Sequence, residues 1–507
     1  GEQREPPGQA RDHEVAAYRH KQRPYPYERD RSGQYRQADE TLLGLARAQR
    51  KLEKIAEARG TIQKLIQEFP MSGILDQAWY RHGEFAYAQA DYPAALAAYD
   101  TVLKTFPQSP YVPFAQYGKG WTLIKQKQYP AATEILTAML TTAPQHALAP
   151  DARFARAMSR RQSNDFNGAV EDLQAYLQGN LDADRKADAL YERGLAEVGA
   201  MKLDAAVASF QQVLRDHPKY ASSDKVRYEL AWAWKSQEKA DEAAAEFGRI
   251  AQLFPESTLV AESLFHVAES QYDRKDFAES AKNYGLTVGK SKSVELTEKA
   301  NYKLGWSQFQ LKQYDAALNQ FSAQLAASPQ GPLAGDGRFM KAECLFRMQK
   351  FSEAYQGFEA ARQAGMIPAR LDSLLLLHAG QSAGQLKMWK ESLDLLSQIP
   401  QKYADSPYVV EARYEMGWAR QNLKQADEAM KDYEFAAINS RDAVGARARF
   451  MMGELLFEKK QFDEAIKQFQ RVMFTYGGEN AVADVKVWQA QAGYDAGRCW
   501  EIGRAHV

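Results

Sequence analysis

The sequence predicts an all-α solenoid of about twelve helix–turn–helix units, and two recurring positions carry that prediction. The first position holds alanine or serine, and most successive members stand 37 residues apart. Its members are Ala58, Ala95, Ala132, Ala169, Ala206, Ala243, Ser280, Ala317, Ala354, Ser392, Ala429 and Ala465. The last steps of 38, 37 and 36 residues indicate small changes in the loops between units. A constant period of this length is typical of repeat proteins, in which each unit stacks on the next.

The second recurring position, here called the small position, lies twelve residues earlier and holds glycine or alanine every time. Its members are Ala46, Gly83, Gly120, Ala157, Gly194, Ala231, Ala268, Gly305, Ala342, Gly380, Gly417 and Gly453. Two antiparallel helices approach closely where side chains are small. We therefore expect the two recurring positions of a unit to meet at the helix crossing.

A large apolar residue follows four residues after each member of the alanine and serine series, which places it on the same helical face. This large position holds Ile62, Tyr99, Leu136, Leu173, Phe210, Phe247, Tyr284, Phe321, Phe358, Leu396, Tyr433 and Phe469. We expect these side chains to fill the space between units. Proline often stands where the second helix of a unit should end, at Pro70, Pro107, Pro144, Pro218, Pro255 and Pro329.

The spacing from Gly83 through Tyr92, Ala95 and Tyr99 to Pro107 resembles the tetratricopeptide repeat, and the resemblance extends over about residues 36–500. It implies a right-handed superhelical solenoid that binds proteins or peptides in a concave groove lined by the first helix of each unit. The usual period is about 34 residues, so this chain adds three in the loops between units. Such loops resemble those of bacterial cell-envelope members, of the cell-division coordinator and outer-membrane assembly lipoprotein kinds. The periplasm or cell envelope is therefore favoured over the cytoplasm.

The predicted domain organisation has three parts. Residues 1–33 are rich in proline and arginine and poor in aliphatic residues, so we expect a disordered polar linker there. The solenoid should span residues 34–500, with its first helix over 34–52 and the first helix of a truncated thirteenth unit over 485–499. The last segment, 501–507, resembles a translated sequencing adapter, and we expect it to be a non-native tail.

Composition argues against several classes of function. The 65 basic and 65 acidic residues cancel, whereas a nucleic-acid binder usually carries a basic face. The two cysteines, Cys344 and Cys499, lack the spacing of a disulfide framework or zinc site, and no apolar stretch approaches the length of a membrane span. The run Gly289-Lys290-Ser291 lacks the leading glycine of a phosphate-binding loop, because Tyr284 stands there. We therefore expect no cofactor, no metal and no catalysis.

The candidate partner-binding residues come from two further repeat positions on the first helices. The groove position lies one residue after the small position and carries tryptophan or glutamate in many units. The ladder position lies three residues before the small position and is nearly always aromatic. The candidates are Trp121, Trp232, Trp306, Trp418, Glu84, Glu269, Glu343, Glu454, Tyr117, Tyr228, Tyr302 and Tyr414. Repeated tryptophans suit protein contacts, and interspersed glutamates suggest ligands that are apolar with some basic character. Alternatively, the indoles cover their own helices and the ladder rings pack as core.

The first functional hypothesis is a non-catalytic scaffold or adaptor that binds protein or peptide partners in the groove. A second is a structural subunit of a bacterial envelope, outer-membrane assembly or cell-division complex, associated with a membrane without spanning it. A third is the helical-repeat part of a larger enzyme. Fold alone does not choose among them.

Overall fold

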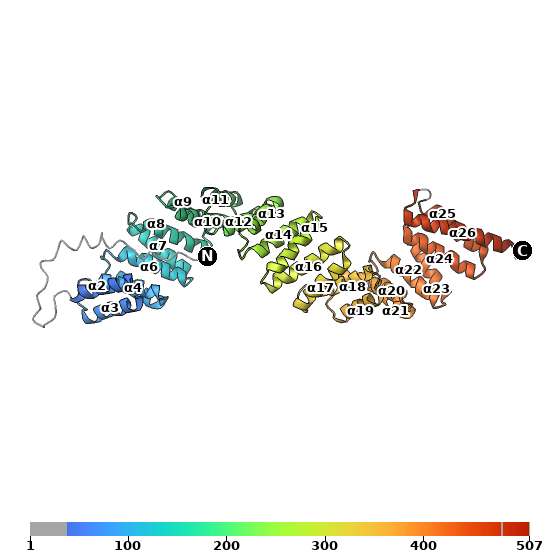
Figure 1. Cartoon of the computed structure of the whole chain (residues 1–507), viewed down its shortest axis with the longest axis horizontal. Coiled ribbons are helices and arrows are strands. Elements are labelled where there is room, and N and C mark those ends of the chain that lie inside the picture. The colour runs from blue at the N-terminus through green and yellow to red at the C-terminus, as the bar shows by residue number, and fades with distance from the viewer. Residues whose placement is uncertain (1–37, 478–479, 506–507) are drawn as a thin grey trace, which may run out of the picture. The chain divides into compact units, whose positions relative to one another are not determined.

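The computed structural model describes residues 38–477 and 480–505, and every regular element in that part of the chain is a helix. The 25 helices confirm the predicted all-α class (Figure 1). The first helices of the units are α2 (Ala38–Lys51), α4 (Leu75–Ala88), α6 (Val112–Lys125), α8 (Ala149–Gln162), α10 (Ala183–Gly199), α12 (Ser223–Ser236), α14 (Val260–Asp273), α16 (Val294–Gln310), α18 (Ala334–Arg347), α20 (Ala369–Gln385), α22 (Val409–Asn422), α24 (Ala443–Glu458) and α26 (Ala483–Ala505). The second helices are α3 (Ile55–Glu68), α5 (Tyr92–Thr105), α7 (Tyr129–Thr142), α9 (Phe166–Leu177), α11 (Leu203–Asp216), α13 (Ala240–Leu253), α15 (Phe277–Lys290), α17 (Tyr314–Ala327), α19 (Phe351–Gln363), α21 (Trp389–Lys402), α23 (Ala426–Asn439) and α25 (Phe462–Thr475).

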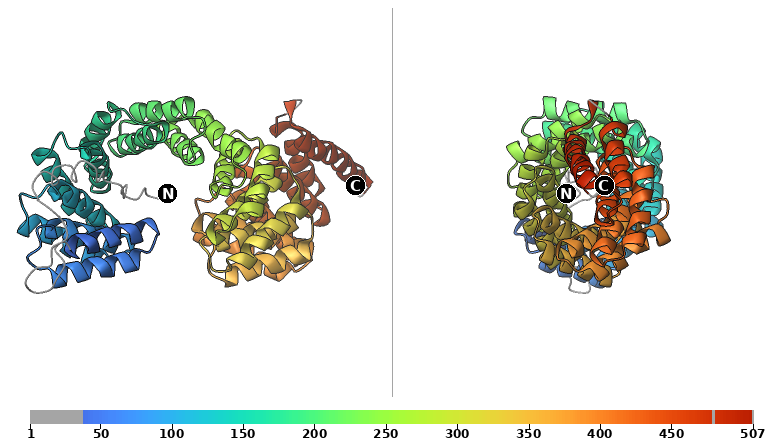
Figure 2. Two further views of the ribbon diagram at one scale, coloured as in Figure 1. Left: turned by 60° about the vertical axis from the view of Figure 1, so that its left-hand side comes forward. Right: turned by 90° about the vertical axis from the view of Figure 1, so that its right-hand side faces the viewer.

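The helices pack pairwise, as the repeat predicts. Helix α4 packs against α5, α16 against α17 and α24 against α25, and α26 stands where the first helix of a thirteenth unit is expected. The chain divides into two compact parts, Gly1–Ile250 and Ala251–Val507. Within each part, successive helix pairs stack side by side (Figure 2).

The helix predicted over 34–52 is α2, which the structure describes from Ala38 to Lys51. The helix expected over 485–499 is α26, which continues to Ala505, inside the segment predicted to be a non-native tail. The expected linker, 1–33, lies outside the described residues. In the described part of the chain, no helix combines the length and the apolarity that crossing a bilayer requires.

The turn between the two helices of a unit uses a left-handed residue. One non-glycine residue with φ between 58° and 64° occurs in each of the twelve described turns, seven residues after the small position. In the second unit this residue is Ala90, and the next backbone N–H, that of Asp91, donates to the carbonyl of Ala86 at 2.9 Å. This bond closes a Schellman motif, which satisfies the last carbonyls of the first helix.

The small position makes room for the large side chain of its own unit. A Cβ added at Gly83 would lie 2.6 Å from the Tyr99 ring, and one added at Gly194 would lie 2.4 Å from the Phe210 ring. Each of these rings occupies the large position of the same unit. Glycine thus lets the facing ring lie directly against the backbone of the first helix. The two recurring positions also meet in the tenth unit, where the Ser392 hydroxyl donates to the Gly380 carbonyl at 2.8 Å.

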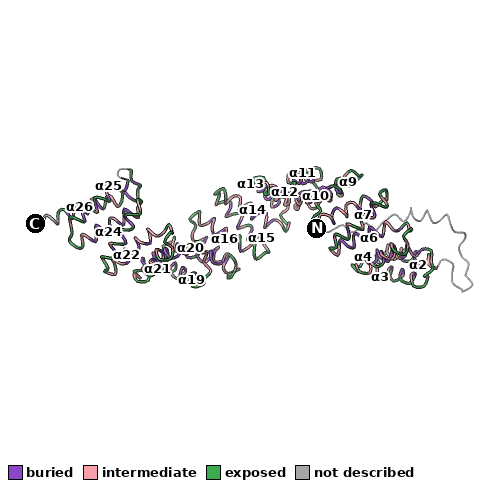
Figure 3. Tube along the Cα trace, turned by 180° about the vertical axis from the view of Figure 1, so that it is seen from behind, coloured by how far each residue is buried: buried purple, intermediate pink, exposed green. Residues whose placement is uncertain are grey.

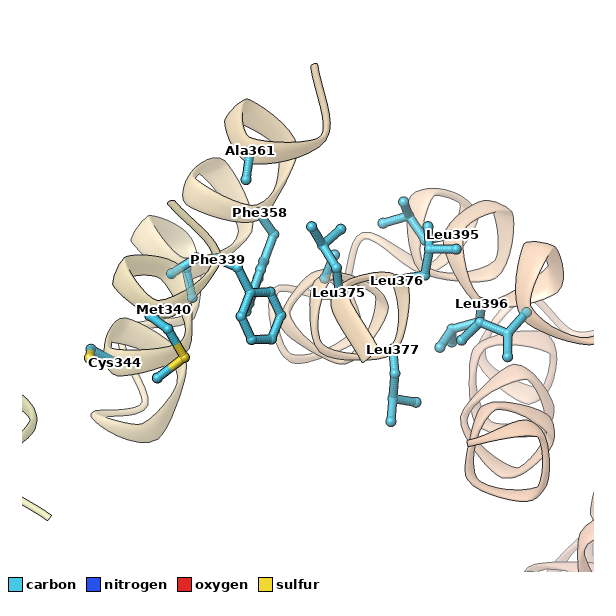
Figure 4. Packing of buried hydrophobic residues seen from close by; sticks show 14 of the residues in the cluster. Phe339, Met340, Cys344, Phe358, Ala361, Leu375, Leu376, Leu377, Leu395 and Leu396 are labelled. Atoms are coloured by element: carbon cyan, nitrogen blue, oxygen red, sulfur yellow. The ribbon is translucent and has the colours of Figure 1, made fainter. Parts of the chain in front are cut away.

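The same large side chains also reach the following unit. A Cβ added at Gly118, on the next first helix, would lie 2.6 Å from Tyr99 as well. Buried residues accordingly concentrate where helices face each other, and exposed residues at the turns (Figure 3). Figure 4 shows one such cluster, in which Phe339, Phe358, Leu375 and Leu396 come from the consecutive helices α18 to α21. Within each part, the core thus consists of clusters formed between neighbouring helices.

Two glycine-to-alanine substitutions test this packing. We expect Gly194→Ala to lower the free energy of unfolding by about 1–3 kcal/mol, because the new methyl group overlaps the fully buried Phe210 ring. The matched control is Gly60→Ala in α3, where no atom lies within 4 Å of the added Cβ, so we expect it to stabilise by about 0.5–1 kcal/mol. Urea titration followed by circular dichroism measures both changes. Equal effects of the same sign would contradict the packing assigned to the small position.

Candidate functional site

A cleft in Gly1–Ile250 gathers residues from four first helices. Its volume is about 840 Å³, and its lining comes from α6, α8, α10 and α12 together with residues 219–222. No residue of a second helix lines it. Because first helices of successive units pack against each other, equivalent side chains of α6, α8 and α10 lie next to one another in the cleft. Volumes of this size are typical of binding sites.

The apolar lining of the cleft comes from Trp121 on α6, Phe154 and Met158 on α8, and Leu195 on α10. Trp121 is only 3% exposed, and its ring packs edge-on against Tyr117 with centroids 6.4 Å apart. Phe154, Met158 and Leu195 are half-buried. A ligand could therefore bury apolar side chains against residues that are already held in place by the helix packing.

Carboxylates from three successive turns of α10 form one wall of the cleft: Asp184, Asp188 and Glu192. The Tyr220 hydroxyl donates to Asp188 Oδ1 at 2.8 Å, which holds the loop before α12 against α10. Lys219 and Lys225 line the cleft beside that tyrosine. The wall is therefore acidic along α10 and basic at the lip formed by the loop and the start of α12.

The Arg161 guanidinium is the counter-charge for two glutamates. Arg161 Nε donates to Glu192 Oε2 at 2.9 Å. Burial raises the pKa of Glu192, and Arg161 only partly offsets that rise. Burial likewise raises the pKa of Glu229, on α12, and Arg161 again lowers it. Two partly desolvated carboxylates thus share one cation, so a second cation brought by a ligand would be stabilised there.

The four predicted tryptophans have different surroundings. Only Trp121 lines the cleft. Trp232 is half-buried against Phe247 with ring centroids 6.0 Å apart, and Trp306 packs against Phe309 at 5.9 Å. Trp418 is also half-buried and lies edge-on to Trp389, 5.0 Å away. These indoles all pack on neighbouring rings while three keep part of their surface exposed, and their role in partner binding stays a prediction.

The four predicted glutamates are partly or fully buried. Glu84 pairs with Arg81 at 2.5 Å, and Glu269 pairs with Lys303 at 2.9 Å. Glu343 is buried, with Oε2 2.6 Å from His378 Nδ1 and Oε1 2.7 Å from Arg347 Nε. Three of these carboxylates therefore already have partners within the chain.

Glu454 is half-buried in α24, and burial raises the pKa of its carboxyl group. Asp495, on α26, raises it further through charge repulsion, whereas Arg498 lowers it. Glu454 is thus the predicted glutamate whose ionised form is least well compensated. A partner-binding role for this residue and for the other three stays a prediction.

The predicted tyrosines belong largely to the core. Tyr117 and Tyr414 are 5% and 3% exposed, and Tyr228 and Tyr302 are half-buried. Several ladder residues pack against the large position of their own unit, as Tyr414 does on Tyr433, with centroids 5.7 Å apart. The ladder therefore forms aromatic pairs within units, which favours the alternative that it is core.

Sequence reasoning selected tryptophan and glutamate at the groove position and so missed Met158 and Leu195, which occupy that position on α8 and α10. An unbroken apolar run from Trp121 through Met158 and Leu195 to Trp232 was the available signal. No comparable signal in the sequence pointed to Arg161 as a cleft residue, because nothing in the repeat pattern indicates which charged residues of separate units come together.

The described residues contain no group of three or more histidine, cysteine or carboxylate side chains arranged to hold a metal ion. Cys344 and Cys499 are both buried and unpaired by disulfide. Burial raises the pKa of the Cys344 thiol to about 12, so it is protonated at neutral pH.

Comparison with known proteins identifies one family. A family model described as tetratricopeptide repeat matches residues 43–110, 80–147, 154–221, 191–258, 302–366 and 414–477, which together are more than half of the chain. That comparison identifies repeats and no catalytic domain. No curated protein matches the chain.

Several solved structures are similar. A tetratricopeptide repeat protein from Parabacteroides merdae is 14% identical, with a TM-score of 0.38, over 54% of this chain and 100% of its own. The C-terminal part of a repeat protein from Cytophaga hutchinsonii is 14% identical, with a TM-score of 0.44, over 51% of this chain and 98% of its own. PilW, a type IV pilus biogenesis factor, is 16% identical, with a TM-score of 0.37, over 45% of this chain and 99% of its own.

Proposed function

Because the chain belongs to the tetratricopeptide repeat family, we propose that it is a non-catalytic scaffold that binds a protein or peptide in the cleft lined by α6, α8, α10 and α12. Tetratricopeptide domains generally mediate protein–protein interaction. The observation that carries the proposal is the cleft itself, which combines apolar side chains of three first helices with a charged wall. An apolar centre beside convergent polar groups is what peptide recognition requires.

Selection from a random dodecapeptide library tests this function. We expect the full chain to enrich a set of related peptides, and we expect the double variant Met158→Asp/Leu195→Asp to lose them, because two carboxylates would replace the apolar floor. The matched control is Met71→Asp, since Met71 is 95% exposed and does not line the cleft. Circular dichroism checks that all three chains are folded. Enrichment of the same peptides by the double variant would exclude the cleft as the binding site.

The finer assignment to bacterial cell-envelope proteins, and with it an envelope location, stays a prediction from the loops between units.

A further inference from the structure

We propose that the cleft selects an extended peptide with apolar side chains at every third residue and a lysine or arginine between two of them. This inference rests on the proposed function and adds the chemistry of the ligand. Two features of the cleft support it: the spacing of its apolar residues and the charge shared around Arg161.

The spacing comes from the repeat. Trp121, Met158 and Leu195 occupy the same repeat position on α6, α8 and α10, which pack against one another in order. Packed helix axes lie about 8–10 Å apart, so equivalent side chains recur at about that interval. An extended or polyproline chain rises about 3.1–3.4 Å per residue, and every third side chain therefore advances by about 9–10 Å. The two intervals match.

The charge around Arg161 places the basic residue of the ligand. Glu192 lines the cleft and Glu229 lies on the neighbouring helix, and both have a raised pKa because burial outweighs the attraction of Arg161. A ligand ammonium or guanidinium would supply the second counter-charge. Lys219 and Lys225 also line the cleft, at and after the loop that carries Tyr220, and would repel a cation there. The basic side chain should therefore lie on the Glu192 side.

Only three successive first helices place an apolar residue of the groove position in the cleft. On α4 the same position is Glu84, which is paired with Arg81 at 2.5 Å. On α12 it is Trp232, which does not line the cleft. The ligand should therefore contact three apolar positions in the cleft, which corresponds to a segment of about seven residues.

Fluorescence anisotropy with defined peptides tests the inference on the full chain. The first peptide has seven residues, with leucine at the first, fourth and seventh positions and lysine and proline between. A second has glutamate in place of lysine, a third has its leucines at every second position, and a fourth is a lysine- and alanine-rich helix with leucines three and four residues apart. We expect the first peptide to bind about tenfold more tightly than each of the others.

Variants of the chain identify the groups responsible. Glu229→Gln and Glu192→Gln should each reduce the preference for lysine over glutamate by about tenfold while keeping the preference for spacing. Leu195→Asp should abolish binding of the first peptide, and Met71→Asp should leave it unchanged. Absence of binding by the first peptide, equal binding of any other peptide, or an unchanged lysine preference in both glutamine variants would overturn the inference. If the library then still yields peptides that depend on Met158 and Leu195, the proposed function stands without this ligand class.

Discussion

Phe210→Ala is expected to lower the free energy of unfolding by about 3–5 kcal/mol, because it removes a fully buried ring from the large position of its unit. The Phe210 ring lies against the backbone of Gly194 and packs on Tyr191 with centroids 6.1 Å apart. Its cluster also contains Val226 and Leu230 from the following first helix. The cavity left by alanine would therefore affect both the unit and its contact with the next one.

Urea unfolding followed by circular dichroism measures the total loss, and hydrogen exchange measured by mass spectrometry shows where it occurs. Repeats contact only their neighbours, so we expect protection to fall in α10 to α12 and to persist in α3 and α4. The matched control is Phe474→Ala, because Phe474 is 73% exposed and its removal should change stability by no more than about 0.5 kcal/mol. A loss below about 1 kcal/mol for Phe210→Ala, or a uniform loss of protection, would contradict this account of the core.

Asp432→Ala is expected to cost about 3 kcal/mol, because it leaves two guanidinium groups without their shared carboxylate. Asp432 is 0% exposed and accepts hydrogen bonds from Arg413, at 2.9 Å, and from Arg420. Burial raises the pKa of Asp432, although both arginines lower it. Desolvation thus offsets much of the attraction, and the cost arises from breaking the network rather than from its net strength.

A triple variant separates these two effects. If Asp432→Leu is combined with Arg413→Leu and Arg420→Met, no buried charge remains unpaired, and we expect stability within about 1 kcal/mol of the parent chain. Asp427→Ala is the control, because the side chain of Asp427 is 82% exposed in its ion pair with Lys459, and its loss should change stability far less than the loss of Asp432. Urea titration of the four chains measures this. A triple variant as unstable as Asp432→Ala would show that the network contributes more than satisfied charges.

The candidate cleft was partly predictable from the sequence. The repeat register gave Trp121 as a candidate, and Trp121 lines the cleft. Phe154 and Tyr191 stand at the ladder position of their units and also line the cleft, but they were not among the candidates. The remaining candidates occupy equivalent positions in the repeat but not equivalent surroundings: Glu343 is buried against His378, and Tyr414 against Tyr433. Side chains at one repeat position differ in exposure because the residues that surround them differ from unit to unit.

The sequence by itself determined the class and the register of the fold. Glycine or alanine at the small position and a large apolar residue sixteen positions later recur in every unit, and such a pattern can bury its apolar faces only by stacking helix pairs. The presence of a helix over 485–499 and the pairing of the helices follow from the same period.

Only the tertiary structure decided what the small position faces, how the turns are made and where the charges meet. Gly194 lies against the Phe210 ring, a contact between two helices that no local pattern specifies. The turns place Ala90, Met201 and Lys127 in the left-handed region, although only glycine or asparagine would have signalled it. Arg161 meets Glu192 of the next unit across 31 residues, because stacking, and not sequence proximity, brings their side chains together.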